Sequence, residues 1–438
     1  MNAAARLSRQ AFRADIAHCL SDPGGFGPGV RWLPDSLLLV ENGVVVGVED
    51  ARPTLPNLSS DWLVHDYAGK IIVPGFVDAH IHYVQTDIIG SFGEQLLEWL
   101  DKYTFPAERK FEDFAHAERT ARFFIKELLK NGTTSALVLG SVHAQSADAI
   151  FSAADAVGMR MVAGKVLMDR NCPAYLRDSP QQGYQESKRL IEQWHGRSRL
   201  GYAITPRFAP TSSEAQLRAA ARLGVEFPDT HIHTHLAENE AEVAWVKALF
   251  PGTRSYLDVY DQMGLLRERS VFAHAIYVDE MDMTRLSDTG ASLVFCPSSN
   301  MFIGSGLFDV ARGLEGDQHL ALGSDVGGGS TFSMLQVASE AYKVAQLRNF
   351  VLTPARLLYL ATLSGAQALS LDGKIGNFMA GKEADFVVLD PDCTAVLKRR
   401  TQEANLADKL FALFVLGDDR AAKATYLMGD LVYDRDFR

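Results

Sequence analysis

Short apolar runs alternate with amphipathic segments through the middle of the chain. Eight runs have the length and composition of buried strands, at residues 75–81, 135–139, 161–167, 201–205, 231–236, 271–275, 291–295 and 319–322. Helix-like stretches separate them, among them residues 111–130, 213–223, 240–250 and 281–288. Strands that are apolar on both faces and alternate with helices predict a parallel sheet whose outer face is covered by helices. Eight such units favour a closed (β/α)8 TIM-like barrel over an open sheet.

The two ends of the chain have a different pattern. Residues 36–48 resemble two short strands around an Asn42-Gly43 turn. Residues 384–389 and 424–433 also resemble strands, with Gly429-Asp430 as a turn. We therefore expect an α/β protein with a small β-sandwich built from both termini, two unrelated hairpins being the alternative. The predicted domains are 1–73 (N-terminal part of the sandwich), 74–375 (barrel) and 376–438 (C-terminal part of the sandwich).

A helical excursion is predicted between the first and second barrel strands, at residues 96–108 and 111–130. It carries Trp99, Tyr103 and Phe105. These aromatic side chains cover the barrel mouth or form a subunit interface, or they are ordinary core residues.

Composition narrows the class of protein. The chain has 438 residues, of which 47% are hydrophobic and 22% charged, as in soluble globular enzymes. Its net charge of −11 is spread along the chain, which argues against nucleic acid as a partner. No apolar run approaches the roughly 18 residues of a membrane span, and the first twenty residues lack the apolar core of a secretory signal. We therefore expect a cytoplasmic protein that does not bind membranes.

Cysteine usage narrows the possible metal chemistry. The four cysteines lie far apart and form no CxxC motif: Cys19, Cys172, Cys296 and Cys393. Neither a disulfide framework nor a thiolate zinc site is expected.

Polar side chains gather where the predicted strands end, which is the edge at which barrel enzymes place their active sites. The first strand ends in His80 and His82, and residues two apart on a strand face the same side. The pair is a candidate for metal binding, although an isolated HxH is also compatible with two ordinary histidines.

The fifth strand carries three histidines on one face, of which only His235 lies at the carboxyl end. We interpret His235 as a metal ligand. We expect His231 and His233 to lie in lower layers of the barrel interior, where hydrogen bonds satisfy their ring nitrogens. Glu238 follows three residues later, where a turn can bring its carboxylate beside a metal-bound water.

The sixth strand ends at His274 and the eighth at Asp325. A buried aspartate after an apolar strand needs a partner or a metal, unless it caps the next helix. Three histidines and one carboxylate suit a catalytic zinc, although iron and manganese stay possible. The fourth strand ends in Thr205-Pro206-Arg207 without a lysine to be carbamylated, so one metal ion fits better than two.

Together these stretches resemble the amidohydrolase superfamily and, within it, the guanine deaminase family. The resemblance covers nearly the whole chain and rests on PGFVDAHIHYVQ (74–85), LLEWLDKYTFPAE (96–108), TPRFAPT (205–211), HLAEN (235–239), FCPSSN (295–300), GSD (323–325) and GKEAD (381–385). Ala79, Val84 and Ser324 replace the threonine, proline and threonine expected there, and none of them is a ligand.

The resemblance implies a zinc-dependent aminohydrolase that converts guanine to xanthine and ammonia through a zinc-activated hydroxide. It implies one zinc ion per subunit, held by His80, His82, His235 and Asp325. Asp325 would also accept a proton or hydrogen bond from the water, His274 would orient that water, and Glu238 would shuttle protons to the ring nitrogen and the leaving amine.

The resemblance also implies the substrate contacts. Gln85 and Arg207 would hydrogen-bond the guanine ring, and Phe208 would lie against it or pack in the core. The metal ligands His82, His235 and Asp325 would touch the substrate as well, together with Glu238. A homodimer and a role in purine catabolism are implied by the same family.

Two other functions remain open. A related amidohydrolase could act on 8-oxoguanine, a pterin or a triazine with the same metal chemistry, although Gln85, Arg207 and the Leu-Glu-Trp-Leu stretch at residues 97–100 favour guanine. A non-catalytic scaffold on the same barrel would be expected to lose ligands, and here all of them are present. The cytidine deaminase fold is excluded because its His-x-Glu and Pro-Cys-x-x-Cys signature does not occur.

Overall fold

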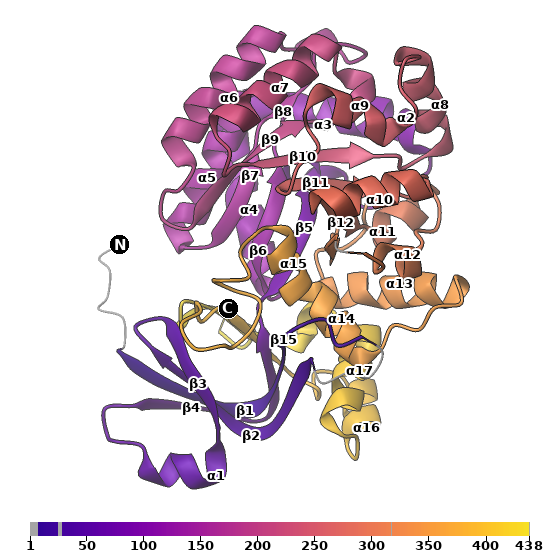
Figure 1. The fold of residues 1–438 in the computed structure, drawn as a ribbon. Helices are drawn as coiled ribbons and strands as arrows, with labels where there is room; N and C mark the ends of the chain where they lie inside the picture. The colour runs from indigo at the N-terminus through magenta and orange to yellow at the C-terminus, as the bar shows by residue number, and fades with distance from the viewer. Residues whose placement is uncertain (1–7, 25–28, 317, 438) are drawn as a thin grey trace.

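The computed structural model describes residues 8–24, 29–316 and 318–437, and it contains two sheets (Figure 1). One is a parallel sheet in the order β13-β12-β11-β10-β9-β7-β6-β5, with β8 paired to β9. Its strands are β5 (Phe76–His82), β6 (Thr133–Leu139), β7 (Arg160–Gly164), β8 (Val166–Leu167), β9 (Leu200–Pro206), β10 (His231–Leu236), β11 (Ser270–His274), β12 (Ser292–Phe295) and β13 (Leu320–Leu322). Each of the eight predicted runs overlaps a strand of this sheet, and the run at 161–167 is divided between β7 and β8.

Backbone hydrogen bonds join the last strand of the sheet to the first. The Asp325 amide donates to the His80 carbonyl at 2.9 Å, and the His82 amide donates to the Val326 carbonyl at 3.3 Å. These bonds nearly close the sheet into the predicted TIM-like barrel, and they place the ends of β5 and β13 side by side.

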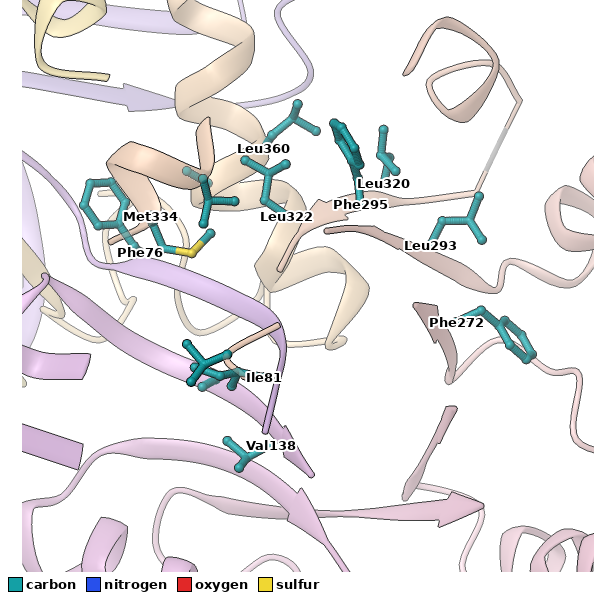
Figure 2. Close-up of a cluster of buried hydrophobic side chains, with 14 of the residues drawn as sticks. Phe76, Ile81, Val138, Phe272, Leu293, Phe295, Leu320, Leu322, Met334 and Leu360 are labelled. Atoms are coloured by element: carbon teal, nitrogen blue, oxygen red, sulfur yellow. The ribbon is translucent and has the colours of Figure 1, made fainter. Parts of the chain in front are cut away.

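Alternate residues of the barrel strands form two apolar layers. Small side chains such as Val77, Ala203 and Ala273 form the inner cluster. Larger ones, including Phe272 and Leu293, belong to the outer cluster, which is shared with the surrounding helices (Figure 2). The two-residue period of a strand gives this division, because successive side chains point to opposite faces. Small inner residues leave room for the polar side chains at the barrel mouth.

Helices surround the barrel (Figure 1). They are α2 (Leu96–Trp99), α3 (Phe105–Arg109), α4 (Phe114–Lys130), α5 (Ala144–Val157), α6 (Pro180–Trp194), α7 (Glu214–Glu226), α8 (Glu240–Leu249), α9 (Tyr256–Met263), α10 (Glu280–Thr289), α11 (Pro297–Phe302), α12 (Val310–Gly313), α13 (Met334–Leu347), α14 (Pro354–Ala361) and α15 (Leu363–Ala368). The helical excursion at 96–108 is confirmed, with a π-helical turn (Leu100–Thr104) joining α2 to α3. None of the described helices is both long and apolar enough to cross a membrane.

Polar caps define where several of these helices begin. Ser213 accepts a hydrogen bond from the Gln216 amide at the start of α7. Asn239 forms a capping box with Glu242 at the start of α8. Such caps satisfy amides that a helix leaves unpaired in its first turn, and the cap at Asn239 also fixes the chain next to Glu238.

The second sheet is assembled from both ends of the chain, as predicted. Its order is β16-β15-β14-β4-β1-β2-β3. The strands are β1 (Arg9–Cys19), β2 (Val30–Glu41), β3 (Val44–Asp50), β4 (Leu63–Pro74), β14 (Phe386–Leu389), β15 (Ala422–Leu427) and β16 (Asp430–Asp434). The remaining helices are α1 (Ala51–Thr54), α16 (Ala395–Thr401) and α17 (Leu406–Leu416). The domain boundaries at 73/74 and 375/376 stay predictions.

One turn of this sheet lies where it was predicted, and a second lies one residue earlier in the chain than predicted. Asn42 and Gly43 both have positive φ, as a tight hairpin turn requires. The second turn lies at Met428-Gly429 rather than Gly429-Asp430, because Met428 and Gly429 have the positive φ values and Asp430 is the first residue of β16.

Candidate active site and metal centre

Three imidazole rings and one carboxylate meet at the mouth of the barrel. The Nε2 atoms of His80 and His82 lie 3.3 and 3.2 Å from Asp325 Oδ1. The Nε2 atoms of His82 and His235 are 3.2 Å apart. One ligand atom from each of these four buried residues lies within 4.8 Å of the others. The four side chains come from β5, β10 and the residues after β13, so closure of the barrel brings them together.

Hydrogen bonds on the far side of two rings determine which nitrogen faces the centre. His235 Nδ1 lies 2.7 Å from the Arg207 carbonyl, which can only accept, so Nδ1 carries the proton and Nε2 presents a lone pair. His80 Nδ1 lies 2.7 Å from His233 Nε2. His80 Nε2 is buried without a hydrogen-bond partner among the described residues. Metal-binding histidines characteristically have such outer partners.

The protonation states also suit a cation. Burial is the main cause that lowers the pKa of His80 to about 4, and burial lowers the pKa values of His82 and His235 too. Burial disfavours the charged form of Asp325, but its contacts with His80 and His82 outweigh this and hold its pKa well below the usual range. Neutral imidazoles and an ionised carboxylate are the forms that bind metals. The donor set therefore fits one divalent cation.

The backbone is unusual where these strands end. Ala237, His274, Ala275 and Asp325 have φ values between 47° and 71°, a region that residues other than glycine seldom occupy. Such conformations cluster at functional sites, where the surrounding structure holds them in place.

Glu238 and His274 lie beside the centre. Glu238 Oε2 is 3.4 Å from His274 Nε2, and its Oε1 accepts a hydrogen bond from Ser305 Oγ at 2.8 Å. Burial raises the pKa of Glu238 to about 7, so this carboxyl group can exchange a proton near neutral pH. His274 Nδ1 lies 2.8 Å from Asn300 Oδ1, so Nδ1 carries the proton in the neutral ring. Burial lowers the pKa of His274, but Glu238 and Asp325 outweigh it and the net shift is upward.

A pocket of about 420 Å³ opens onto this group. Its wall contains every predicted substrate contact: His82, Gln85, Arg207, Phe208, His235, Glu238 and Asp325. His80 and His274 do not line the pocket, and both are fully buried. His231 and His233 lie among the lower layers as predicted, with His231 Nε2 3.0 Å from the Leu369 carbonyl.

The sequence argument missed several residues at the site. The pocket wall contains Trp99, for which the sequence analysis gave a place at the barrel mouth as one alternative. It also contains residues to which that analysis gave no contact: Leu96, Leu100, Thr104, Ser299, Ile303 and Gly328. Behind the wall, Glu108 binds Arg207 and Gln85, while Asn300 and Ser305 hold His274 and Glu238. Glu108 and Asn300 lie in motifs that the sequence analysis quoted without giving them a role. Ser305 lies outside every quoted motif.

Comparison with known proteins agrees with this geometry. The model of the amidohydrolase family matches residues 71–432. A guanine deaminase of Escherichia coli (strain K12) is 50% identical over 423 residues, covering 96% of each chain. The guanine deaminase of Homo sapiens is 35% identical over 425 residues, covering 91% of this chain and 92% of that one.

Solved structures with the same fold extend this result. The E. coli guanine deaminase structure has a TM-score of 0.95 and covers 97% of this chain and 100% of its own. A guanine deaminase from C. acetobutylicum with bound guanine in the active site has a TM-score of 0.89 at 28% identity, with 97% and 100% covered.

Proposed function

The chain belongs to the amidohydrolase family, and from this membership we propose that it is a hydrolase that deaminates guanine to xanthine and ammonia. Half of its residues are identical to those of a guanine deaminase over nearly the full length of both chains. The observation that carries the proposal is the convergence of three imidazoles and a carboxylate beneath a pocket that contains Gln85, Arg207 and Glu238.

We propose that His80, His82, His235 and Asp325 hold one zinc ion per subunit. The Nε2 atoms of His80 and His82 both lie close to Asp325 Oδ1, and the Nε2 atoms of His82 and His235 face each other, which supports this assignment. When bound, zinc supplies Lewis acidity that lowers the pKa of a coordinated water from about 15.7 to about 7. Metal analysis of the purified protein tests the element, with iron and manganese as the other outcomes.

Glu238 is the proton carrier in this proposal. It receives a proton from the attacking water and passes it to the ring nitrogen N3 as the C2–O bond forms. It then takes the proton of the new C2 hydroxyl group and delivers it to the amino nitrogen as the C2–N bond breaks and ammonia leaves. Overall, guanine and water become xanthine and ammonia. Ser305 holds Oε1, so Oε2 is the atom directed toward His274 and the centre. His274 orients the water and steadies the charge that develops during attack.

Gln85 and Arg207 hold the ring in this proposal. Both are buried polar side chains in the pocket wall, and Phe208 is a buried apolar neighbour. A wall of this kind discriminates strongly, because a ligand without matching polar groups leaves buried donors and acceptors unpaired.

A substrate panel tests the proposal. Metal-assayed protein is incubated with guanine, adenine, 8-oxoguanine, cytosine, a pterin and a triazine, and ammonia release is measured. We expect rapid release from guanine with equimolar xanthine. Faster ammonia release from another heterocycle would show that this compound, and not guanine, is the substrate. No ammonia release from any compound of the panel would favour a scaffold role.

The cytoplasmic location, the role in purine catabolism and the homodimer stay predictions. Light scattering on the purified protein tests the dimer.

A further inference from the structure

Glu108 is a fully buried carboxylate directly behind the pocket wall. It lies on α3, and its side chain has no exposed surface. Arg207 Nη1 donates to both of its oxygens, at 2.8 and 2.9 Å. Gln85 Nε2 donates to Oε1 at 3.2 Å. One carboxylate therefore binds two side chains that line the pocket, although it does not line the pocket itself.

The contact with Arg207 does two things. It balances a guanidinium whose side chain is only 3% exposed, and a buried charge without a partner is strongly unfavourable. It also selects the donors that face the ligand. Among the described residues, the side-chain hydrogen bonds that Arg207 donates leave from Nη1 and end on Glu108. The N–H groups of Nη2 and Nε are left for a ligand, while the Phe105 ring, 5.6 Å from the guanidinium carbon, supports the group.

The contact with Gln85 fixes the direction of an amide. An amide has a donor end and an acceptor end, and an ionised carboxylate can only accept. Glu108 therefore holds Nε2 toward itself and turns Oε1 away. A neutral amide side chain in place of Glu108 could donate as well as accept, so Gln85 could turn either its Nε2 or its Oε1 toward it.

We propose that Glu108 is a positioning residue that sets the donor and acceptor pattern of the pocket wall. Through Arg207 it presents donors, and through Gln85 it presents an acceptor. That pair matches a ring edge on which a carbonyl oxygen adjoins an N–H, which is the C6 and N1 edge of an oxopurine. The choice of an oxopurine rests on the proposed function, and the pairing through Glu108 rests on the contacts alone.

Binding of two unreactive purines separates this role from a general structural one. Hypoxanthine has the oxo and N–H edge but no amino group to lose, and purine lacks that edge. The ratio of their dissociation constants, measured by calorimetry on the metal-loaded protein, reports how strongly the wall selects the edge. In Glu108→Gln we expect this ratio to fall by about tenfold or more, the size of one lost charge-assisted hydrogen bond.

The control is Glu112→Gln, because Glu112 is an exposed glutamate four residues along the same segment. It should keep the wild-type ratio. Glu108→Asp, which keeps the charge on a shorter side chain, should give a ratio between those of the wild type and Glu108→Gln. With guanine, Glu108→Gln should raise KM more than it lowers kcat.

Epistasis tests whether Glu108 acts through Arg207 as well as Gln85. In an Arg207→Met, Gln85→Leu background, adding Glu108→Gln should leave the ratio unchanged. A wild-type ratio in Glu108→Gln, or equal weakening of both ligands, overturns the proposal. If Glu108→Gln does not fold, a wild-type ratio in Glu108→Asp overturns it. Failure of the wild type to release ammonia from guanine would reject the proposed function, and the binding ratio would still test Glu108.

Discussion

At the scale of single residues, hydrogen-bond partners outside the site determine how the histidine rings of the site are oriented. The Arg207 carbonyl orients His235, His233 orients His80, and Asn300 orients His274. The oxygen acceptors fix the proton on Nδ1 of His235 and of His274, and all three contacts turn the Nε2 atom of the ring toward the centre. The backbone and the side chain of Arg207 thus have separate contacts, since its carbonyl contacts His235, a proposed metal ligand, and its guanidinium lines the pocket.

Replacing Arg207 with alanine is therefore expected to damage guanine turnover without loss of metal. The guanidinium disappears, but the carbonyl that orients His235 remains. Loss of charge-assisted hydrogen bonds should lower kcat/KM by roughly ten- to a hundredfold. Steady-state kinetics and metal analysis of the same preparation check this. A parallel fall in metal content would show that the side chain supports the metal centre instead.

Replacing Glu238 with glutamine is expected to remove proton transfer. The amide keeps the shape of the side chain but does not exchange a proton near neutral pH, so kcat should fall by about 10²–10⁴-fold. The bound metal should stay, because Glu238 is outside the ligand group. The neighbouring exposed Glu240 offers a matched control, Glu240→Gln. Near-normal kcat in Glu238→Gln would assign the proton to another group.

At the scale of elements, buried strands were predictable because their sequence differs from their surroundings. All eight barrel runs and the histidines at their ends follow from continuous apolar stretches bounded by polar residues. Strands β1 and β4 were missed because their residues mix polar and apolar types without a clear period, and the first half of β4 is largely exposed. Their pairing is decided by contacts between the ends of the chain.

The candidate site was predictable to the same extent. The proposed ligands and Glu238 lie at or directly after strand ends, so topology alone gathers them. Glu108 and Ser305 reach the site from α3 and from the loop after α11, and only tertiary packing brings them there. A local pattern carries no information on such contacts, which is why sequence reasoning gave these two residues no role.

Gly164 lies where two barrel strands approach each other too closely for a side chain. A Cβ there would lie 1.8 Å from the Ala203 carbonyl oxygen on β9, and backbone cannot move aside as a flexible side chain can. Gly164→Ala should lower the free energy of unfolding by about 3 kcal/mol, the upper end of ordinary overpacking. Urea denaturation measures this. Gly252→Ala is the control, because an added Cβ at Gly252 meets no atom within 4 Å. Equal stability of both variants would contradict the packing argument.

At the scale of the whole molecule, a group of ion pairs fastens the terminal sheet to the barrel. Arg199, which precedes β9, binds Glu383 and Asp385, which precede β14. Arg160 on β7 also binds Glu383, through Nε at 2.8 Å. Burial raises the pKa of Asp385, while Arg199 acts in the opposite direction. The arginines are thus the counterions of carboxylates that water scarcely reaches.

Removing Arg199 should therefore be costly. Arg199→Met leaves Asp385 buried without its cation, and breaking a buried pair in this way costs about 3–5 kcal/mol. Arg122→Met, which removes an exposed pair with Glu118, should change stability little. Thermal unfolding of both variants against the wild type checks the contrast. Similar melting temperatures for Arg199→Met and the wild type would mean that packing alone holds the two sheets together.

The stability of the whole molecule should also depend on pH through His18. This β1 residue is buried beside Phe378, whose amide donates to Nδ1 at 3.4 Å, and burial, followed by Arg31 and Lys382, lowers its pKa to about 4. Between pH values of about 6.5 and 4, His18 is protonated in the unfolded chain but stays neutral in the folded chain. Stability from this group is therefore complete above the unfolded pKa and is lost as the pH falls, at about 1.4 kcal/mol per pH unit.

Replacement of His18 by glutamine isolates this contribution, since every other titrating group is common to both proteins. Urea denaturation at several pH values between 7.5 and 4.5 should give a shallower decline for His18→Gln than for the wild type. Below pH 6.5 the slopes of the two curves of unfolding free energy against pH should differ by the equivalent of about one bound proton. Above pH 7 the two curves should run parallel. Curves that stay parallel over the whole range would mean that His18 takes up its proton without unfolding, and that the junction between β1 and Phe378 opens to water.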